Sequence, residues 1–366
     1  MSSLKPPVSV VYLARAAEGI EAIENFRQSY VEHDAGIDHD LVVCLKGDDA
    51  SETREVRTLL EPIATRFVTQ TDAGYDIHAY LQTAKTLETR WVCCLNTFSL
   101  ISKPGWLEFL YKAAIRPNAG LVGATASYES RRATLAAWIW YMGRLIDGEP
   151  MRAQTHDQFL YLIEALERGF RVPRFGRLGR RLRLWGLEDE PFRRRHLLLW
   201  RDDLINDPPF PGFPNPHVRS NGFMLRTDVL MRFSSLGPTK VDCYNFESGH
   251  EGLSATLAKE GLDLLLVGDQ GAFAVDDWPR SKTFRAGAQE ALLIRDNQTK
   301  TFSEMPPAIR ELHRYFTWGD AAVDPRDFEF PPLPSVRNGV GSPQRAEELA
   351  RAPASSGPRG ATLPSA

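Results

Sequence analysis

Two carboxylates and one imidazole stand close together in the segment 246–252, FESGHEG: Glu247, His250 and Glu251. A carboxylate near a hydroxyl group can accept its proton as a general base, and a histidine can contact an anion or a hydroxyl group. The ordinary alternatives are an ion pair or cap for Glu247, a surface position for His250, and a favourable place in a helix dipole for Glu251. We expect Glu247 in a loop that faces a cleft and Glu251 in the first turn of the next helix.

Polar residues also follow three apolar runs that have the character of β-strands. These runs are Val8–Leu13, Leu41–Leu45 and Trp91–Leu95, and predicted helices separate them. Strands that alternate with helices predict a mostly parallel sheet, which binds ligands beyond the carboxyl ends of its strands. The residues at those ends are therefore candidate binding residues: Ala14, Arg15, Lys46, Asp48, Asp49, Asn96 and Thr97.

The pattern of the remaining chain predicts one large domain over residues 1–334. Further strands are expected at 120–127, 220–226 and 263–267, and a helix at 251–260. Between about 130 and 210 the alternation is lost, which predicts a helical or irregular insertion rich in arginine. After residue 334 the composition turns to Pro, Ser, Ala, Gly and Arg, so 335–366 is predicted to be a disordered tail.

Composition excludes several classes of protein. The 366 residues carry 44 Lys and Arg against 47 Asp and Glu, a net charge of -3 that gives no field to recruit nucleic acid. The longest apolar run, 135–146, is too short to span a membrane, and the N-terminal run is too short for a signal peptide. We therefore expect a cytoplasmic protein. The cysteines show neither zinc nor disulfide spacing and are expected in the core: Cys44, Cys93, Cys94 and Cys243.

The order of these segments resembles that of family 2 glycosyltransferases with the GT-A fold. The resemblance is carried by VSVVYLAR (8–15), KPGWL (103–107), SNGFMLRTDVL (220–230) and LSATLAKEG (253–261). It covers roughly 8–128 and 217–275. It implies an α/β fold with a mostly parallel mixed sheet flanked by helices. It also implies sugar transfer from a nucleotide-sugar donor to a glycan or lipid-linked acceptor in bacterial polysaccharide synthesis, with inversion at the sugar carbon.

Two other functions remain open at this point. One is a GT-A-like binding or scaffold protein of a polysaccharide assembly complex that has lost catalysis. The other is a nucleotidyltransferase, which shares the nucleotide-binding sheet but usually has a Gly-rich phosphate loop after its first strand; here LARAAEG has one glycine.

The resemblance implies roles for the acidic segment 246–252. In the family an acidic pair precedes a leucine that lies eight residues before a glycine, and Leu253 and Gly261 have this spacing. Strict alignment puts the pair on Gly249 and His250, while carboxylates stand on either side. The resemblance therefore implies that Glu247 is the catalytic base, with Glu251 and His250 as further catalytic candidates.

The resemblance also implies a metal motif after the strand Trp91–Leu95, but Asn96, Thr97, Phe98 and Ser99 contain no carboxylate. Hard cations such as Mg²⁺ and Mn²⁺ require oxygen ligands, chiefly carboxylates. No metal ligand is predicted, and the use of a divalent cation stays open. Without it, cationic groups would neutralise the leaving diphosphate, and the candidates are Arg15, Lys46, Lys103, His217 and Arg219.

The remaining contacts implied by the resemblance divide into donor and acceptor sides. Asp76 and His78 lie in the segment placed under the nucleotide, with a helix cap as the alternative for Asp76. Asp48 and Asp49 could accept hydrogen bonds from a nucleobase or ribose, or they could be simple turn residues. The acceptor candidates are Arg219, Asn221, Trp278 and Asn297, and packing of a C-terminal extension is the alternative for the last two.

Arginines and apolar side chains alternate over Arg168–Arg201. Such a surface suits anionic lipid headgroups, which predicts a peripheral contact with the inner face of the cytoplasmic membrane. Contact with an anionic glycan or a partner protein is a second interpretation, and a solvated cover over the sheet is a third.

Overall fold

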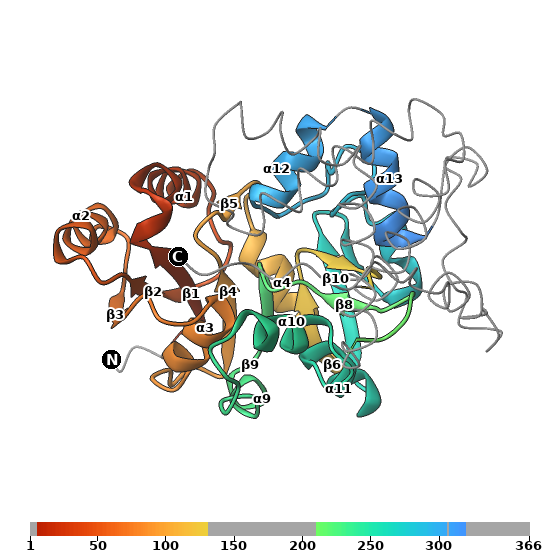
Figure 1. Ribbon diagram of the computed structural model, residues 1–366, viewed down its shortest axis with the longest axis horizontal. Coiled ribbons are helices and arrows are strands. Elements are labelled where there is room, and N and C mark those ends of the chain that lie inside the picture. Colours follow the sequence, from red (N-terminus) through yellow and green to blue (C-terminus); the bar gives the residue numbers. More distant parts are fainter. Residues whose placement is uncertain (1–5, 131–209, 306, 320–366) are drawn as a thin grey trace, which may run out of the picture. The chain divides into compact units, whose positions relative to one another are not determined.

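The computed structural model describes residues 6–130, 210–305 and 307–319. The chain divides into two units, Met1–Thr134 with Asn206–Glu329 and Leu135–Ile205 with Phe330–Ala366. All described residues belong to the first unit, shown in Figure 1. Residues 131–209 of the predicted insertion, including Arg168–Arg201, and the predicted tail 335–366 lie outside the described residues.

An eight-stranded mixed sheet forms the centre of this unit, with strand order β11-β10-β6-β9-β4-β1-β2-β3. Its strands are β1 (Val8–Arg15), β2 (His39–Lys46), β3 (Arg66–Gln70), β4 (Trp91–Leu95), β6 (Ala119–Gly123), β9 (Phe223–Arg226), β10 (Asp263–Gly268) and β11 (Gly271–Phe273). Among the described strands of this sheet, only β9 and β11 run antiparallel to their neighbours. The α/β class and the mostly parallel mixed sheet predicted from the sequence are confirmed.

Two short strand pairs accompany the sheet. β5 (Leu100–Ile101) pairs with β12 (Ile294–Arg295), and β7 (Ala126–Ser127) pairs with β8 (His217–Val218). The strand predicted over 120–127 is thus broken into β6 and β7, and the one predicted over 220–226 begins later, at the start of β9.

The helices are η1 (Ala16–Glu18), α1 (Ile20–Glu32), α2 (Ala50–Leu60), α3 (Asp76–Ala84), α4 (Trp106–Ala114), α9 (Thr227–Met231), α10 (Lys240–Ser248), α11 (Leu253–Lys259), η2 (Val275–Arg280), α12 (Asn297–Glu304) and α13 (Pro307–Trp318). Within the described residues no helix has the length and apolar character needed to span a membrane.

Helix α10 corrects the predicted setting of the acidic segment. A capping box between Thr239 and Asp242 starts this helix, so Glu247 lies in its last turn and not in a loop. Helix α11 begins at Leu253, after the extended N-cap Gly252. Glu251 therefore precedes the helix and does not belong to its first turn.

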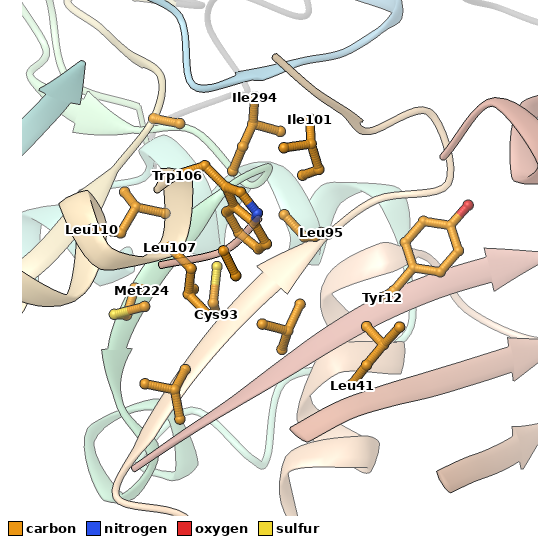
Figure 2. Close-up of a cluster of buried hydrophobic side chains, with 14 of the residues drawn as sticks. Tyr12, Leu41, Cys93, Leu95, Ile101, Trp106, Leu107, Leu110, Met224 and Ile294 are labelled. Atoms are coloured by element: carbon orange, nitrogen blue, oxygen red, sulfur yellow. The ribbon is translucent and has the colours of Figure 1, made fainter. Parts of the chain in front are cut away.

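Alternation along the strands separates two apolar layers, as expected for a sheet that is buried on both faces. Val10 and Tyr12 of β1 face the layer covered by α1, α2 and α4, whereas Val11 and Leu13 face α3, α9, α10 and α11 (Figure 1). In the first layer, Trp106 of α4 and Cys93 of β4 belong to one cluster of buried side chains (Figure 2). The four cysteines are buried and unpaired, which confirms their predicted place in the core.

Candidate active site

The turn before β9 reaches the edge of the sheet where β1 and β4 end, because β9 pairs antiparallel with β4 and Cys94 lies opposite Phe223. The buried Asn221 side chain ties this turn to the residues after β4. Its Oδ1 accepts hydrogen bonds from the Asn96 backbone N–H at 2.9 Å and from the Ser99 hydroxyl at 2.7 Å. Its Nδ2 is buried and has no hydrogen-bond partner among the described residues, so this donor is left over for a ligand.

Glu247 joins the same edge from the last turn of α10. Its Oε2 accepts a hydrogen bond from the Ser220 backbone N–H at 2.8 Å, and its Oε1 lies 3.9 Å from Nε2 of His217. The Glu247 side chain is 18% exposed. One oxygen is therefore fixed by the turn before β9, while the other is bonded to no described residue.

Local charges keep this carboxylate ionised. Burial raises the pKa of Glu247, but the Arg219 guanidinium, His217 when its ring is protonated, and the Ser220 hydrogen bond together outweigh burial and bring the pKa below its ordinary value. A carboxylate must be ionised to accept a proton. Glu247 meets this requirement at neutral pH.

His217 stands behind Glu247 as a neutral imidazole. Burial lowers the pKa of His217 more strongly than the charge of Glu247 raises it. Nδ1 of His217 lies 2.8 Å from the Asn215 carbonyl oxygen, so the proton of the neutral ring belongs on Nδ1. Nε2 is then an acceptor that faces Glu247, and the two groups together can bind hydroxyl protons.

Asp76 and His78 lie on α3, which packs against α10. Asp76 is the first residue of α3, its Oδ1 accepts from the Ile77 N–H, and the N-cap is Tyr75. Burial raises the pKa of Asp76, the Lys240 charge opposes this rise, and Glu247 adds to it. The carboxylates of Asp76 and Glu247 therefore act on each other electrostatically.

Several buried polar atoms near this junction lack a partner within the described part of the chain. They are Nδ1 of His78, the Tyr80 hydroxyl, Nδ2 of Asn221 and Oδ1 of Asn245. Tyr80 packs edge-on against Phe223 at 6.0 Å, which connects α3 to the start of β9. An unpaired buried polar atom costs free energy, so a polar ligand at this junction would recover that cost.

Arg15 and Lys46 are bonded to the segment after β3. The Arg15 guanidinium donates two hydrogen bonds to Asp72, at 2.7 and 2.6 Å. Nζ of Lys46 donates to the carbonyl oxygens of Asp72, at 3.0 Å, and Gly74, at 2.5 Å. The hydrogen bond with Arg15 is the main reason that the pKa of Asp72 is lowered. Both cations therefore hold the loop 72–74.

Asp72 was missed by the sequence reasoning, although a signal was present. It follows β3 at the carboxyl edge, as the candidate residues follow β1, β2 and β4. The rule that found those candidates applies equally to the third parallel strand.

The other donor-binding candidates are buried or form hydrogen bonds within the protein. Ala14 is fully buried, and Asp48 accepts a hydrogen bond from the Asp72 N–H at 2.9 Å. Asp49 caps α2 by accepting from the N–H groups of residues 51 and 52, which is the turn alternative considered above. The Thr97 hydroxyl is buried and donates to the β1 carbonyl of residue 13 at 2.8 Å.

The remaining catalytic and acceptor candidates lie elsewhere. His250 and Glu251 are exposed, and the His250 carbonyl oxygen accepts from Lys259. Trp278 is 0% exposed, and its Nε1 donates to the β11 carbonyl of residue 273 at 3.2 Å. The ring of Trp278 is thus a core group that an acceptor sugar cannot stack on. Asn297 is exposed at the start of α12.

Two cationic candidates have partners of their own. Arg219 places its guanidinium 4.5 Å from the centre of the Phe284 ring and donates to Gln298 at 2.7 Å. Lys103 forms an ion pair with Asp269 at 2.8 Å. Arg219 is the cation whose charge acts on Glu247.

The residues after β4 do not fit a divalent cation. Oδ1 of Asn96 already accepts from the Phe98 N–H and the Ser99 hydroxyl, at 3.0 and 3.3 Å, and no carboxylate is present. Magnesium and manganese sites are built from hard oxygen ligands, usually with carboxylates among them. Across the described residues no three His, Cys, Asp or Glu side chains gather as a metal site.

Comparison with known proteins gives matches only among solved structures. The mannosyltransferase PcManGT from Pyrobaculum calidifontis, in complex with GDP-Man and Mn2+, is 13% identical over 86% of this chain and 70% of that chain, with a TM-score of 0.36. S. aureus TarS is 16% identical over 32% of this chain and 21% of that chain, with a TM-score of 0.25. No protein-family model and no curated protein matches the chain.

Proposed function

We propose that this chain is a glycosyltransferase that moves a sugar from a nucleotide-sugar donor to a glycan or lipid-linked acceptor in bacterial polysaccharide synthesis. The observation that carries the proposal is the setting of Glu247 at the carboxyl edge of a mostly parallel sheet, where such sheets bind ligands. Its Oε2 is held by the Ser220 N–H, and its Oε1 is bonded to no described residue. The carboxylate is oriented and ionised.

In the proposed reaction Glu247 accepts the proton of the acceptor hydroxyl while that oxygen attacks the anomeric carbon of the donor sugar. The bond between this carbon and the diphosphate oxygen breaks, and the nucleoside diphosphate leaves from the opposite face, so the configuration inverts. The free amide of Asn221 would orient the acceptor. Arg219 would stabilise negative charge on the leaving diphosphate without a metal ion.

The donor is proposed to lie along the ends of β1, β2 and β4, near Asp76, His78 and Asn96. Arg15 and Lys46 are committed to Asp72 and its loop. Their proposed part is therefore to position the loop 72–74 beside the donor, and not to neutralise its phosphates directly.

Donor binding is tested by thermal unfolding with UDP-, GDP-, CMP- and dTDP-sugars, each with EDTA and with Mn²⁺. A ligand that binds only the folded state stabilises it by about 2.7 kcal/mol at one hundred times its dissociation constant. An increase in melting temperature that persists in EDTA is the expected result. No increase with any donor would instead favour a GT-A-like scaffold protein, the alternative suggested by the missing aspartates after β4.

The role of Glu247 is tested with the donor that binds, by measuring the release of its nucleoside diphosphate. Glu247→Gln keeps an oxygen that can accept from the Ser220 N–H, so the fold and donor binding should persist. Release should fall by about 10²–10⁴-fold, the usual contribution of a general base. Glu251→Gln, at the nearby exposed carboxylate, is the matched control and should retain the rate. Equal loss in both variants would contradict the assignment.

A further inference from the structure

Two exposed tyrosines and a lysine form a cluster where α3 meets α10. Tyr75 is 47% exposed and Tyr244 is 38% exposed. Nζ of Lys240 lies 5.1 Å from the centre of each ring. We name these three residues the tyrosine–lysine cluster. Its ammonium group lies near two aromatic rings that are each partly exposed.

Two members of the cluster, Lys240 and Tyr244, lie on α10, the helix that also carries Glu247. Lys240, Tyr244 and Glu247 have the spacing i, i+4, i+7, which places them on one face of a helix. Seven residues of helix advance about 10 Å. The backbone positions of Lys240 and Glu247 are therefore separated along the helix axis by about the length of a short saccharide.

The third member of the cluster adds a contact from the other helix. Tyr75 is the N-cap of α3, next to Asp76, and α3 and α10 lie side by side (Figure 1). The charge of Lys240 acts on Asp76, and the charge of Asp76 is coupled to that of Glu247. The cluster therefore lies where α3 and α10 are in contact, and its ammonium group and the Glu247 carboxylate both act electrostatically on Asp76.

The chemistry of the cluster matches a charged sugar. Exposed tyrosine rings present an apolar face and a polar hydroxyl, which suits the apolar C–H face and the hydroxyl rim of a sugar ring. A neutral sugar would gain little from a cation fixed between the rings, whereas a carboxylate or phosphate on the sugar would gain a charge-assisted hydrogen bond.

We propose that Tyr75, Lys240 and Tyr244 form an acceptor subsite for a sugar unit that carries a carboxylate or a phosphate. This inference rests on the proposed function, because it places the acceptor chain beside Glu247. The anionic unit lies on the cluster, and the acceptor hydroxyl lies further along α10 at the base.

The experiment is a ligand-observed NMR titration at low salt with two pairs of probes. The first pair is the disaccharide of glucuronic acid linked to glucose, and neutral cellobiose. The second pair is glucose 6-phosphate and glucose. Two unit charges about 4 Å apart in water interact by about 1 kcal/mol, so one anionic probe should bind about fivefold more tightly than its neutral partner. The pair that shows the preference identifies the anion as carboxylate or phosphate.

Variants assign the preference to the cluster. Lys240→Gln should abolish the difference between charged and neutral probes, and Tyr75→Ala should weaken both. Lys112→Gln, at an exposed lysine of α4, is the control and should change neither. Raising the salt concentration should reduce the preference in the wild-type protein.

Several results would overturn the inference: no binding of any probe, equal binding within both pairs, or a preference that survives Lys240→Gln. A role limited to joining α3 and α10 would lower the melting temperature of Tyr75→Ala and leave the binding of the probes unchanged. Donor binding, measured on the same preparations, separates the two proposals. A donor that binds without any probe preference removes only the subsite, whereas absent donor binding removes the glycosyltransferase assignment.

Discussion

The substitution Lys46→Met tests whether a buried ammonium group holds the loop 72–74 against the sheet. Lys46 is 2% exposed. Its Nζ donates to the carbonyl oxygens of Asp72 and Gly74 at 3.0 and 2.5 Å, and lies 3.5 Å from Oδ1 of Asp72. Methionine replaces the apolar stem up to Cε and lacks only the terminal ammonium group, so the perturbation is largely confined to the charge and its hydrogen bonds.

The expected magnitude follows from these contacts. Hydrogen bonds to a charged group contribute about 1.5–3 kcal/mol each, and the cost of keeping an ammonium group out of water offsets part of the sum. Asp72 keeps its pairing with Arg15 in the variant, so no carboxylate is left alone. We expect the free energy of unfolding to fall by about 2–4 kcal/mol.

The assay is equilibrium urea unfolding followed by tryptophan fluorescence, with the dependence on denaturant compared between variants. Lys112→Met is the matched control, because Lys112 is 65% exposed and, among the described residues, forms an ion pair only with Glu108, across one helical turn. The free energy of unfolding of Lys112→Met should fall by less than about 0.5 kcal/mol. If Lys46→Met unfolds at the same urea concentration as the control, the reasoning about this loop is wrong.

Three further predictions concern acid sensitivity and packing. The pKa of Asp72 is lowered chiefly by its hydrogen bond with Arg15. Its contribution is therefore present at neutral pH and lost as the pH falls through the lowered value, and Asp72→Asn should be less stable than wild type at pH 7 but not in strong acid. Burial lowers the pKa of His313 to about 3. Between about pH 6.5 and 3 only the unfolded chain binds this proton. As the pH falls through this range, the free energy of unfolding of the wild type should therefore decrease by up to about 1.4 kcal/mol per pH unit more than that of His313→Gln, measured by urea titration. A Cβ at Gly123 would lie 2.3 Å from a methyl carbon of the β8 valine, whereas one at Gly212 would meet no atom of the described residues within 4 Å. Gly123→Ala should therefore cost about 1–3 kcal/mol in urea unfolding and Gly212→Ala almost nothing.

The sequence by itself determined the centre of the sheet. The runs that form β1, β2 and β4 are continuous, apolar and rich in β-branched residues. Such a pattern predicts a buried strand from neighbouring residues alone. The same apolar runs placed three of the four cysteines, Cys44, Cys93 and Cys94, in the core. Helix α10 was missed because its apolar periodicity is weak and its start depends on the capping box of Thr239 and Asp242.

The candidate site was determined only by the tertiary structure. Glu247 stood out in the sequence as a carboxylate, but its hydrogen bond comes from Ser220, 27 residues earlier in the chain. Likewise, Arg15 and Lys46 were recognised as cations, yet whether they face a phosphate or Asp72 depends on how the end of β3 lies beside β2. Residue type and spacing set what a side chain can do chemically. The partners that orient it, change its pKa or occupy its hydrogen bonds come from distant parts of the chain, because long-range packing alone brings them together.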